Sequence, residues 1–147
     1  MKAKVLVVDD ETEFVELMQY NLAREGFEVF TATNGIEALH EARRILPDAI
    51  LLDVMLPDMD GLSVCEILRM QPSTTDVPVI IVSALDGEVI RGRSLQARAT
   101  CRFKKPVDIA NLCSEVRKLC EEQQETVRRR VGAAPADPLS ERETTAT

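Results

Sequence analysis

The sequence predicts an α/β fold, a doubly wound parallel sheet of five strands flanked by five helices. Three short apolar runs, at residues 5–8, 49–52 and 79–82, end at charges or turn residues, which is typical of strands buried on both faces. Segments of helical periodicity lie between these runs, so we expect right-handed βαβ units. The strand order that suits five parallel strands is 2-1-3-4-5, with strands 1 and 3 side by side.

The strands are expected over residues 4–8, 27–32, 49–52, 79–83 and 100–104. The second strand alternates apolar and polar residues, and the fifth is short. The first strand leads into Asp9-Asp10-Glu11, and the third leads into Asp53 and a loop marked by Pro57 and Gly61. Because ligands bind at the carboxyl ends of the strands in open α/β sheets, these acids lie where a site is expected.

The helices are expected from Thr12 to Gly26, from Gly35 to Pro47, from Gly61, over 87–98, and from Asp108 until the periodicity fades after Gln123. Thr12 and Asp108 are the predicted N-caps, and Gly26 is the predicted stop of the first helix. The apolar stripe of that helix is predicted to be Phe14, Leu17, Met18 and Leu22. From Gly132 onward the sequence is typical of a flexible polar tail.

Composition excludes several classes of function. The chain has 147 residues, enough for one domain with its own core, and a net charge of −7, which disfavours nucleic acid and anionic membranes as partners. No run approaches the roughly 20 apolar residues of a membrane span, and the first apolar run is too short for a signal peptide. The four cysteines lack Cys-x-x-Cys spacing and His40 is the only histidine, so we expect reduced cysteines, no zinc site and a cytoplasmic location.

Polar residues follow four of the five strands at what is expected to be one edge of the sheet. They are Asp9 and Asp10 after the first strand, Asp53 after the third, Ser83 at the end of the fourth and Lys105 after the fifth. Three converging carboxylates repel one another unless a cation joins them, and Mg²⁺ prefers such hard oxygen ligands. A lysine and a hydroxyl beside a metal-bound carboxylate suit phosphoryl transfer, with the aspartate as nucleophile.

Each of these residues also has an ordinary structural explanation when it is considered singly. Asp9-Asp10 can be favourable charge near a helix N-terminus, Asp53 can cap a loop, and Lys105 before Pro106 can be a solvated loop residue. Their occurrence together after four strands is what favours a phosphoryl-transfer site.

Four motifs over residues 3 to about 121 resemble the receiver domain of bacterial two-component response regulators, in its stand-alone, CheY-like form. They are Val-Leu-Val-Val-Asp-Asp-Glu at 5–11, Leu-Leu-Asp-Val-Met-Leu-Pro-Asp-Met-Asp-Gly at 51–61, Val-Ser-Ala at 82–84 and Lys-Lys-Pro at 104–106. The resemblance implies a receiver domain over residues 1–121, followed by a helix extension and flexible tail over 122–147. The 29 residues after Lys118 are too few and too polar for an output domain. We therefore expect either a stand-alone receiver that signals by protein contact or the receiver part of a longer chain.

The resemblance also implies the roles of the site residues. Asp53 would accept phosphate from a phosphohistidine on a sensor histidine kinase or phosphotransfer protein. Mg²⁺ would be bound directly by Asp10, Asp53 and the backbone carbonyl of Met55, and through water by Asp9. Ser83 would hydrogen-bond the phosphoryl group, Lys105 would pair with it, and the Lys105–Pro106 bond would be cis. The protein would be a signalling phosphoprotein rather than an enzyme. Its interaction surface would lie on the fourth helix, the fifth strand and the fifth helix.

The sequence departs from the family at the position of the aromatic switch residue, three residues before the lysine. Arg102 occupies that position, and Phe103 is expected to face the other side of the strand. The segment around it is basic, with Arg91, Arg93, Arg98, Arg102 and Lys104. A solvated face explains this charge simply, and recruitment of an acidic downstream protein is the functional hypothesis.

Two further expectations and two rival functions depend on single residues. Met55 and Leu85 flank the path of the hydrolytic water in the family, and their apolar side chains predict a long-lived phosphoryl group.

An aspartate-nucleophile phosphohydrolase would need a second acid where Met55 stands. An interaction module that works without phosphorylation would typically lack one of the acids or the lysine, but Arg102 keeps this alternative open.

Overall fold

A computed structural model describes residues 2–133 of the chain. Its five strands form one all-parallel sheet in the order β2-β1-β3-β4-β5, which confirms the predicted topology. The elements in chain order are β1 (Lys4–Val8), α1 (Thr12–Arg24), β2 (Glu28–Ala32), α2 (Gly35–Ile45), β3 (Ala49–Leu52), α3 (Gly61–Met70), β4 (Val79–Ser83), α4 (Glu88–Gln96), β5 (Cys101–Lys104) and α5 (Ile109–Ala133).

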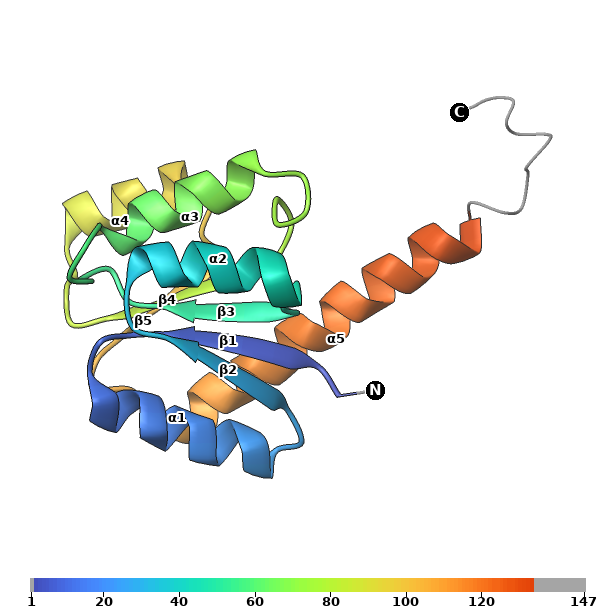
Figure 1. Cartoon of the computed structure of the whole chain (residues 1–147), viewed down its shortest axis with the longest axis horizontal. Coiled ribbons are helices and arrows are strands. Elements are labelled where there is room, and N and C mark those ends of the chain that lie inside the picture. The colour runs from blue at the N-terminus through green and yellow to red at the C-terminus, as the bar shows by residue number, and fades with distance from the viewer. Residues whose placement is uncertain (1, 134–147) are drawn as a thin grey trace.

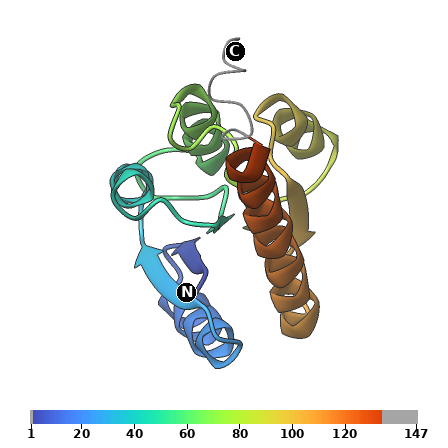
Figure 2. The same cartoon turned by 90° about the vertical axis from the view of Figure 1, so that its right-hand side faces the viewer.

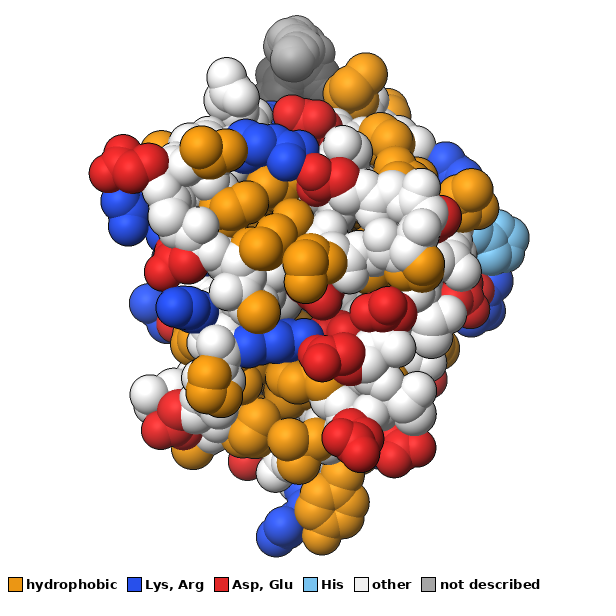
Figure 3. Space-filling model, turned by 90° about the vertical axis from the view of Figure 1, so that its left-hand side faces the viewer, with side chains coloured by type: hydrophobic (Ala, Val, Ile, Leu, Met, Phe, Trp, Pro, Cys, Tyr) orange, Lys and Arg blue, Asp and Glu red, His pale blue; other side chains and the backbone are white. Residues whose placement is uncertain are grey.

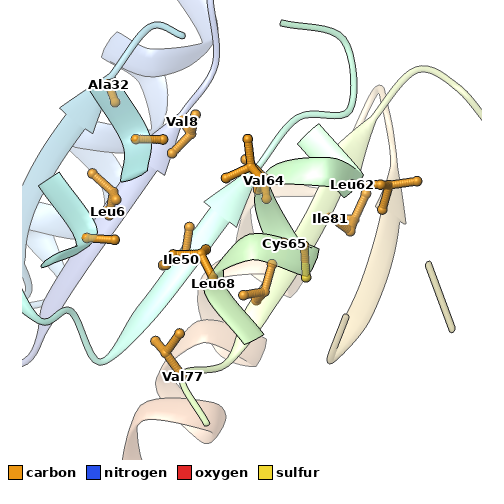
Figure 4. Close-up of a cluster of buried hydrophobic side chains, with 14 of the residues drawn as sticks. Leu6, Val8, Ala32, Ile50, Leu62, Val64, Cys65, Leu68, Val77 and Ile81 are labelled. Carbon is orange, nitrogen blue, oxygen red and sulfur yellow. The ribbon is translucent and has the colours of Figure 1, made fainter. Parts of the chain in front are cut away.

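Helices cover both faces of the sheet, because successive residues of the central strands point to opposite sides. Leu6 and Val8 of β1 belong to a core with α2 and α3, whereas Val5 and Val7 belong to a second core with α1 and α5. Figures 1 and 2 show this arrangement, and Figure 4 shows side chains of the first core, including Ile50 between the sheet and α3.

Helix α1 differs from the sequence-based expectation in its start and in its buried face. Helix α1 begins at Thr12 rather than after it, with Glu11 in the N-cap position and no side-chain cap. Leu17 is exposed, and Val15 is buried instead, together with Met18 and Leu22. The helix is rotated so that Leu17 borders the carboxyl edge of the sheet, where it lines a cleft described below.

Helix α5 is longer than its apolar periodicity predicts. It continues past Gln123 and Gly132 to Ala133, and Figure 1 shows its end projecting from the body of the molecule. Half of the ten added residues are Glu, Gln or Arg, which are good helix formers, and Glu125 pairs with Arg128 and Arg129 along the helix. The predicted tail from residue 134 lies outside the described residues. Within residues 2–133, no helix is both long and apolar enough to cross a membrane.

Candidate functional site

The three predicted carboxylates meet at the carboxyl edge of the sheet. Asp9 follows β1 and Asp53 follows β3, and these strands are neighbours joined by the hydrogen bond from the Asp53 amide to the Val8 carbonyl (3.1 Å). Oxygen atoms of Asp9, Asp10 and Asp53 all lie within 4.8 Å of one another. Asp9 and Asp53 are 1% and 5% exposed, whereas Asp10 is exposed. Such a cluster of hard oxygen donors, open on one side, fits a divalent cation.

Lys105 reaches this cluster from the loop after β5, where its peptide bond to Pro106 is cis as expected. Its Nζ lies 2.7 Å from Asp9 Oδ2, 2.6 Å from Glu11 Oε1 and 3.6 Å from Asp53 Oδ2. The ammonium group also lies 4.4 Å from the centre of the Phe14 ring. The contacts of Lys105 with Glu11 and Phe14 were not predicted, although Glu11 directly follows the Asp-Asp motif.

Burial and hydrogen bonding move the pKa values of two members of the cluster. Burial raises the pKa of Asp9, although hydrogen bonds from Lys105 and from the Glu11 amide act in the opposite direction. Burial by itself would lower the pKa of Lys105, but its hydrogen bonds to Asp9 and Glu11, together with the nearby charges of Asp53 and Asp9, outweigh burial and raise that pKa. The two buried carboxyl groups of Asp9 and Asp53 thus face the single ammonium group of Lys105, and this excess of acidic groups favours binding of a further cation.

The loop that follows Asp53 is held against the site by backbone contacts. The Met55 amide donates to Asp53 Oδ1 (3.2 Å), and Met55 forms an isolated antiparallel bridge with Asp60. Gly61 closes the loop, with its amide bonded to the Val54 carbonyl (2.8 Å). A Cβ atom on Gly61 would lie 1.9 Å from the Asp53 carbonyl oxygen, so only glycine allows α3 to begin this close to the end of β3.

Two other acids of this loop bind helix N-termini. Asp58 accepts hydrogen bonds from the amides of Gly35 (2.7 Å) and Ile36 (2.9 Å) in α2. Asp60 caps α3 through the Leu62 amide (2.7 Å), and its other oxygen lies 2.6 Å from Arg93 of α4. Neither role was predicted from the sequence, although an acid before a helix-opening glycine is a recognisable capping signal.

Ser83 ends β4 at the same edge. It is buried, and its Oγ accepts a hydrogen bond from the Leu85 amide (3.3 Å). Met55 and Leu85, which were singled out for the lifetime of a phosphoryl group, are both exposed.

A cleft of about 610 Å³ opens beside the acids. One side is lined by Asp10, Asp53 and Lys105, and the other by apolar side chains, which are Phe14, Leu17, Val107 and Ile109. Figure 3 looks onto this edge of the sheet and shows acidic and basic side chains meeting between two hydrophobic areas. The cleft thus places a polar reaction site next to a surface suited to an apolar contact.

The position of the aromatic switch is occupied as predicted by Arg102, with Phe103 on the opposite side of β5. Arg102 Nη1 lies 3.3 Å from Asp86 Oδ1 in the loop before α4, whereas Phe103 packs against the core under α1 and α5. The basic segment is less positive than its composition suggests, because three of its five basic residues lie near acids of the same domain. Arg93 pairs with Asp60 and Arg102 with Asp86, and Arg91 makes a longer contact of 3.9 Å with Glu88.

Comparison with known proteins agrees with this geometry. The response regulator receiver domain family matches residues 5–117. The response regulator PleD of Caulobacter vibrioides is 45% identical over 119 residues, which cover 81% of this chain and 26% of PleD. The alkaline phosphatase synthesis transcriptional regulatory protein PhoP of Bacillus subtilis is 39% identical over 139 residues, covering 95% of this chain and 54% of PhoP. The chain thus spans about a quarter of one relative and half of the other.

Solved structures show the same fold. A CheY-like response regulator receiver domain protein from Methanospirillum hungatei matches with a TM-score of 0.81 and 26% identity, over 86% of this chain and 99% of the other. The receiver domain of the Francisella response regulator 1452 matches with a TM-score of 0.76 and 32% identity, over 82% and 98% of the two chains.

Proposed function

Because this chain belongs to the response regulator receiver domain family, we propose that it accepts a phosphoryl group on Asp53 from a phosphohistidine of a sensor histidine kinase or phosphotransfer protein in the cytoplasm. The observation that carries the proposal is the meeting of Asp53 with Asp9, Asp10 and Lys105 beside a cleft that Asp10, Asp53 and Lys105 line. The domain is then a phosphoacceptor that takes part in its own modification, not an enzyme that turns over a separate substrate.

The residues of the cluster divide the work of transfer. A carboxylate oxygen of Asp53 attacks phosphorus, the bond from phosphorus to the histidine nitrogen breaks, and the imidazole leaves with the electron pair. Mg²⁺ would neutralise charge on the phosphoryl oxygens, held by Asp10, Asp53 and the Met55 carbonyl, with Asp9 binding through water. The Ser83 hydroxyl would donate a hydrogen bond to one phosphoryl oxygen. The ammonium group of Lys105 would leave Asp9 and Glu11 and pair with another phosphoryl oxygen.

The apolar side of the cleft would receive the phosphodonor. Phe14 and Leu17 of α1 and Val107 and Ile109 at the start of α5 flank the acids. An apolar helix face docked there would bring a histidine on that helix to Asp53 and exclude water from the reaction.

The downstream partner would bind the surface of α4, β5 and α5. Arg91 and Lys104 are exposed on α4 and β5 and would supply the positive charge for an acidic protein. Arg93 and Arg102 are paired at 2.6 and 3.3 Å, whereas the contact of Arg91 with Glu88 is longer, at 3.9 Å, and exposed.

The test is the intact mass of the protein after incubation with acetyl phosphate, with and without Mg²⁺. Wild type is expected to gain one phosphoryl group only when Mg²⁺ is present, and Asp53→Ala is expected to gain none. Asp58→Asn is the matched control, because Asp58 belongs to the same loop but lies outside the cluster, and it should gain the group.

The same experiment decides the rival function, an interaction module that works without phosphorylation. The observation in its favour is Arg102, which is paired with Asp86 where the family resemblance leads us to expect an aromatic switch. A folded wild-type protein that gains no phosphoryl group would establish this alternative and overturn the proposal.

A further inference from the structure

Helix α4 is attached to the domain by few apolar contacts. Ser94 is its only buried residue between Glu88 and Gln96, and Val89 and Leu95 are each 73% exposed. Gly87 precedes the helix without a side-chain cap, and Gly92 lies in its middle. Glycine in a helix interior costs about 0.5–1 kcal/mol relative to alanine, so the local sequence does little to hold this helix in place.

Polar contacts fix α4 instead. At its carboxyl end, the buried Cys65 thiol donates to the Ala97 carbonyl (3.3 Å) and Arg69 Nε donates to the Arg98 carbonyl (3.1 Å). In the helix itself, Arg93 Nη1 lies 2.6 Å from Asp60 Oδ2. The side chains of Arg93 and Asp60 are 39% and 34% exposed, so water screens this ion pair only in part.

Asp60 links this ion pair to the phosphoacceptor through a short series of contacts. One Asp60 oxygen caps α3 and the other binds Arg93. Its backbone forms the bridge with Met55, and the Met55 amide donates to Asp53 Oδ1. Asp53, Met55, Asp60 and Arg93 therefore form a continuous path from the reacting carboxylate to the fourth helix.

We infer that the Arg93–Asp60 ion pair couples the state of Asp53 to α4, and that in this chain it acts where Arg102 leaves β5 without an aromatic side chain. The inference rests on the proposed function, since it concerns what phosphorylation of Asp53 does. A phosphoryl group on Asp53 changes the oxygen that accepts the Met55 amide, and the bridge carries this change to Asp60. The ion pair then carries it to a helix that has few other contacts to resist movement.

Three variants isolate the ion pair. Asp60→Asn keeps an N-cap residue for α3, because asparagine caps as well as aspartate, and removes only the charge. Arg93→Gln removes the opposite charge, and the double variant tests whether the two changes are independent. Arg91→Gln is the matched control, since Arg91 is on the same helix and its only ion pair among the described residues is a 3.9 Å contact with Glu88.

The measurement is amide hydrogen exchange of residues 88–96, before and after phosphorylation by acetyl phosphate and Mg²⁺, with the phosphorylated fraction taken from intact mass. Before phosphorylation, exchange is expected to rise roughly two- to five-fold in Arg93→Gln and in Asp60→Asn, the factor that corresponds to a partly exposed ion pair. The double variant should exchange no faster than either single variant, and Arg91→Gln should match wild type.

After phosphorylation, wild type should show a changed exchange rate in residues 88–96. Arg93→Gln should gain the same phosphoryl group and lose most of that change. A variant that is phosphorylated and still shows the full wild-type change would overturn the inference and leave the proposed function standing. Absence of a phosphoryl group from wild type would overturn the proposed function. If the effects of Asp60→Asn and Arg93→Gln on exchange before phosphorylation added up in the double variant, the two residues would act independently, and the inference would be overturned.

Discussion

Helices α3 and α4 follow successive strands of the same sheet but are held by different forces. Helix α3 buries Leu62, Val64, Cys65 and Leu68 against the sheet and has a capping aspartate at its start. Helix α4, of nearly the same length, buries only Ser94 within its bounds and has no side-chain cap. The stabilisation from apolar burial does not depend on nearby charge. The stabilisation from an ion pair does depend on it.

The difference indicates how a receiver can be stable and responsive at once. Helix α3 gives the site a fixed reference, since its first residue lies against the backbone of Asp53. Helix α4 can adjust at low cost, because its position depends on contacts of modest energy. The loop between Asp53 and α3 contacts both helices through Asp60, which caps α3 and forms the ion pair with Arg93 of α4.

Alanine substitution of a glycine should have opposite effects in the two helices, and the larger effect belongs to α3. Gly61→Ala places a Cβ atom within 1.9 Å of the Asp53 carbonyl oxygen, which is backbone and cannot turn aside. We expect unfolding stability to fall by about 3 kcal/mol or more, measured by urea unfolding. Unchanged stability would show that the start of α3 is not the fixed reference described above.

Gly92→Ala should stabilise α4. No atom lies within 4 Å of a Cβ at this position, so the substitution adds helix propensity of about 0.5–1 kcal/mol without a clash. Amide exchange in residues 88–96 should slow, and the effect of phosphorylation on these amides should become smaller. Faster exchange in Gly92→Ala would contradict the account of α4 as a helix weakened by its own sequence.

The smallest expected effect concerns the pH dependence of stability. It arises from Asp58, through which the loop between Asp53 and α3 binds the start of α2. Hydrogen bonds from the Gly35 and Ile36 amides lower the pKa of Asp58 below its usual value of 3.8. The stability from this depressed pKa is fully present above the unfolded-state value and is lost as pH falls through the folded-state value. The drop in urea midpoint from pH 6 to pH 3 should therefore be smaller in Asp58→Asn than in wild type.

Glu16→Gln is the control for that measurement, because Glu16 is exposed on α1 and forms no ion pair among the described residues. An equal acid sensitivity of Asp58→Asn and wild type would mean that α2 does not anchor the loop through this carboxylate.

The fold and the meeting of the acids could be predicted because both follow from strand patterning. Uninterrupted apolar runs mark buried parallel strands, and parallel strands deliver their last residues to one edge of the sheet. Strand patterning alone therefore predicts that Asp9, Asp53, Ser83 and Lys105 lie at one edge of the sheet, where the structure has them, and the period-two alternation predicts that Phe103 lies opposite Arg102.

The pairings of long side chains could not be predicted in the same way. The contact of Arg93 with Asp60 depends on the rotation of α4 about its axis, and a helix that buries only Ser94 leaves little apolar pattern to indicate that rotation. Glu11 reaches Lys105 across 94 residues, a separation over which sequence spacing carries no geometric information. The length of α5 was underestimated because its last turns are built from polar helix formers without an apolar period.

Helix α5 extends well beyond the core of the domain. Cys120 is its last buried residue up to Val131, and the 13 residues from there to Ala133 extend about 20 Å at the rise of an α-helix. Along this stretch Arg130 lies 3.8 Å from Asp76, and both side chains are exposed. A tilt of about 10° at Cys120 would carry the far end of such a rigid helix about 3 Å sideways. A rearrangement within the domain that tilted α5 by this amount would thus become a displacement the size of a side chain at the point where the described chain ends.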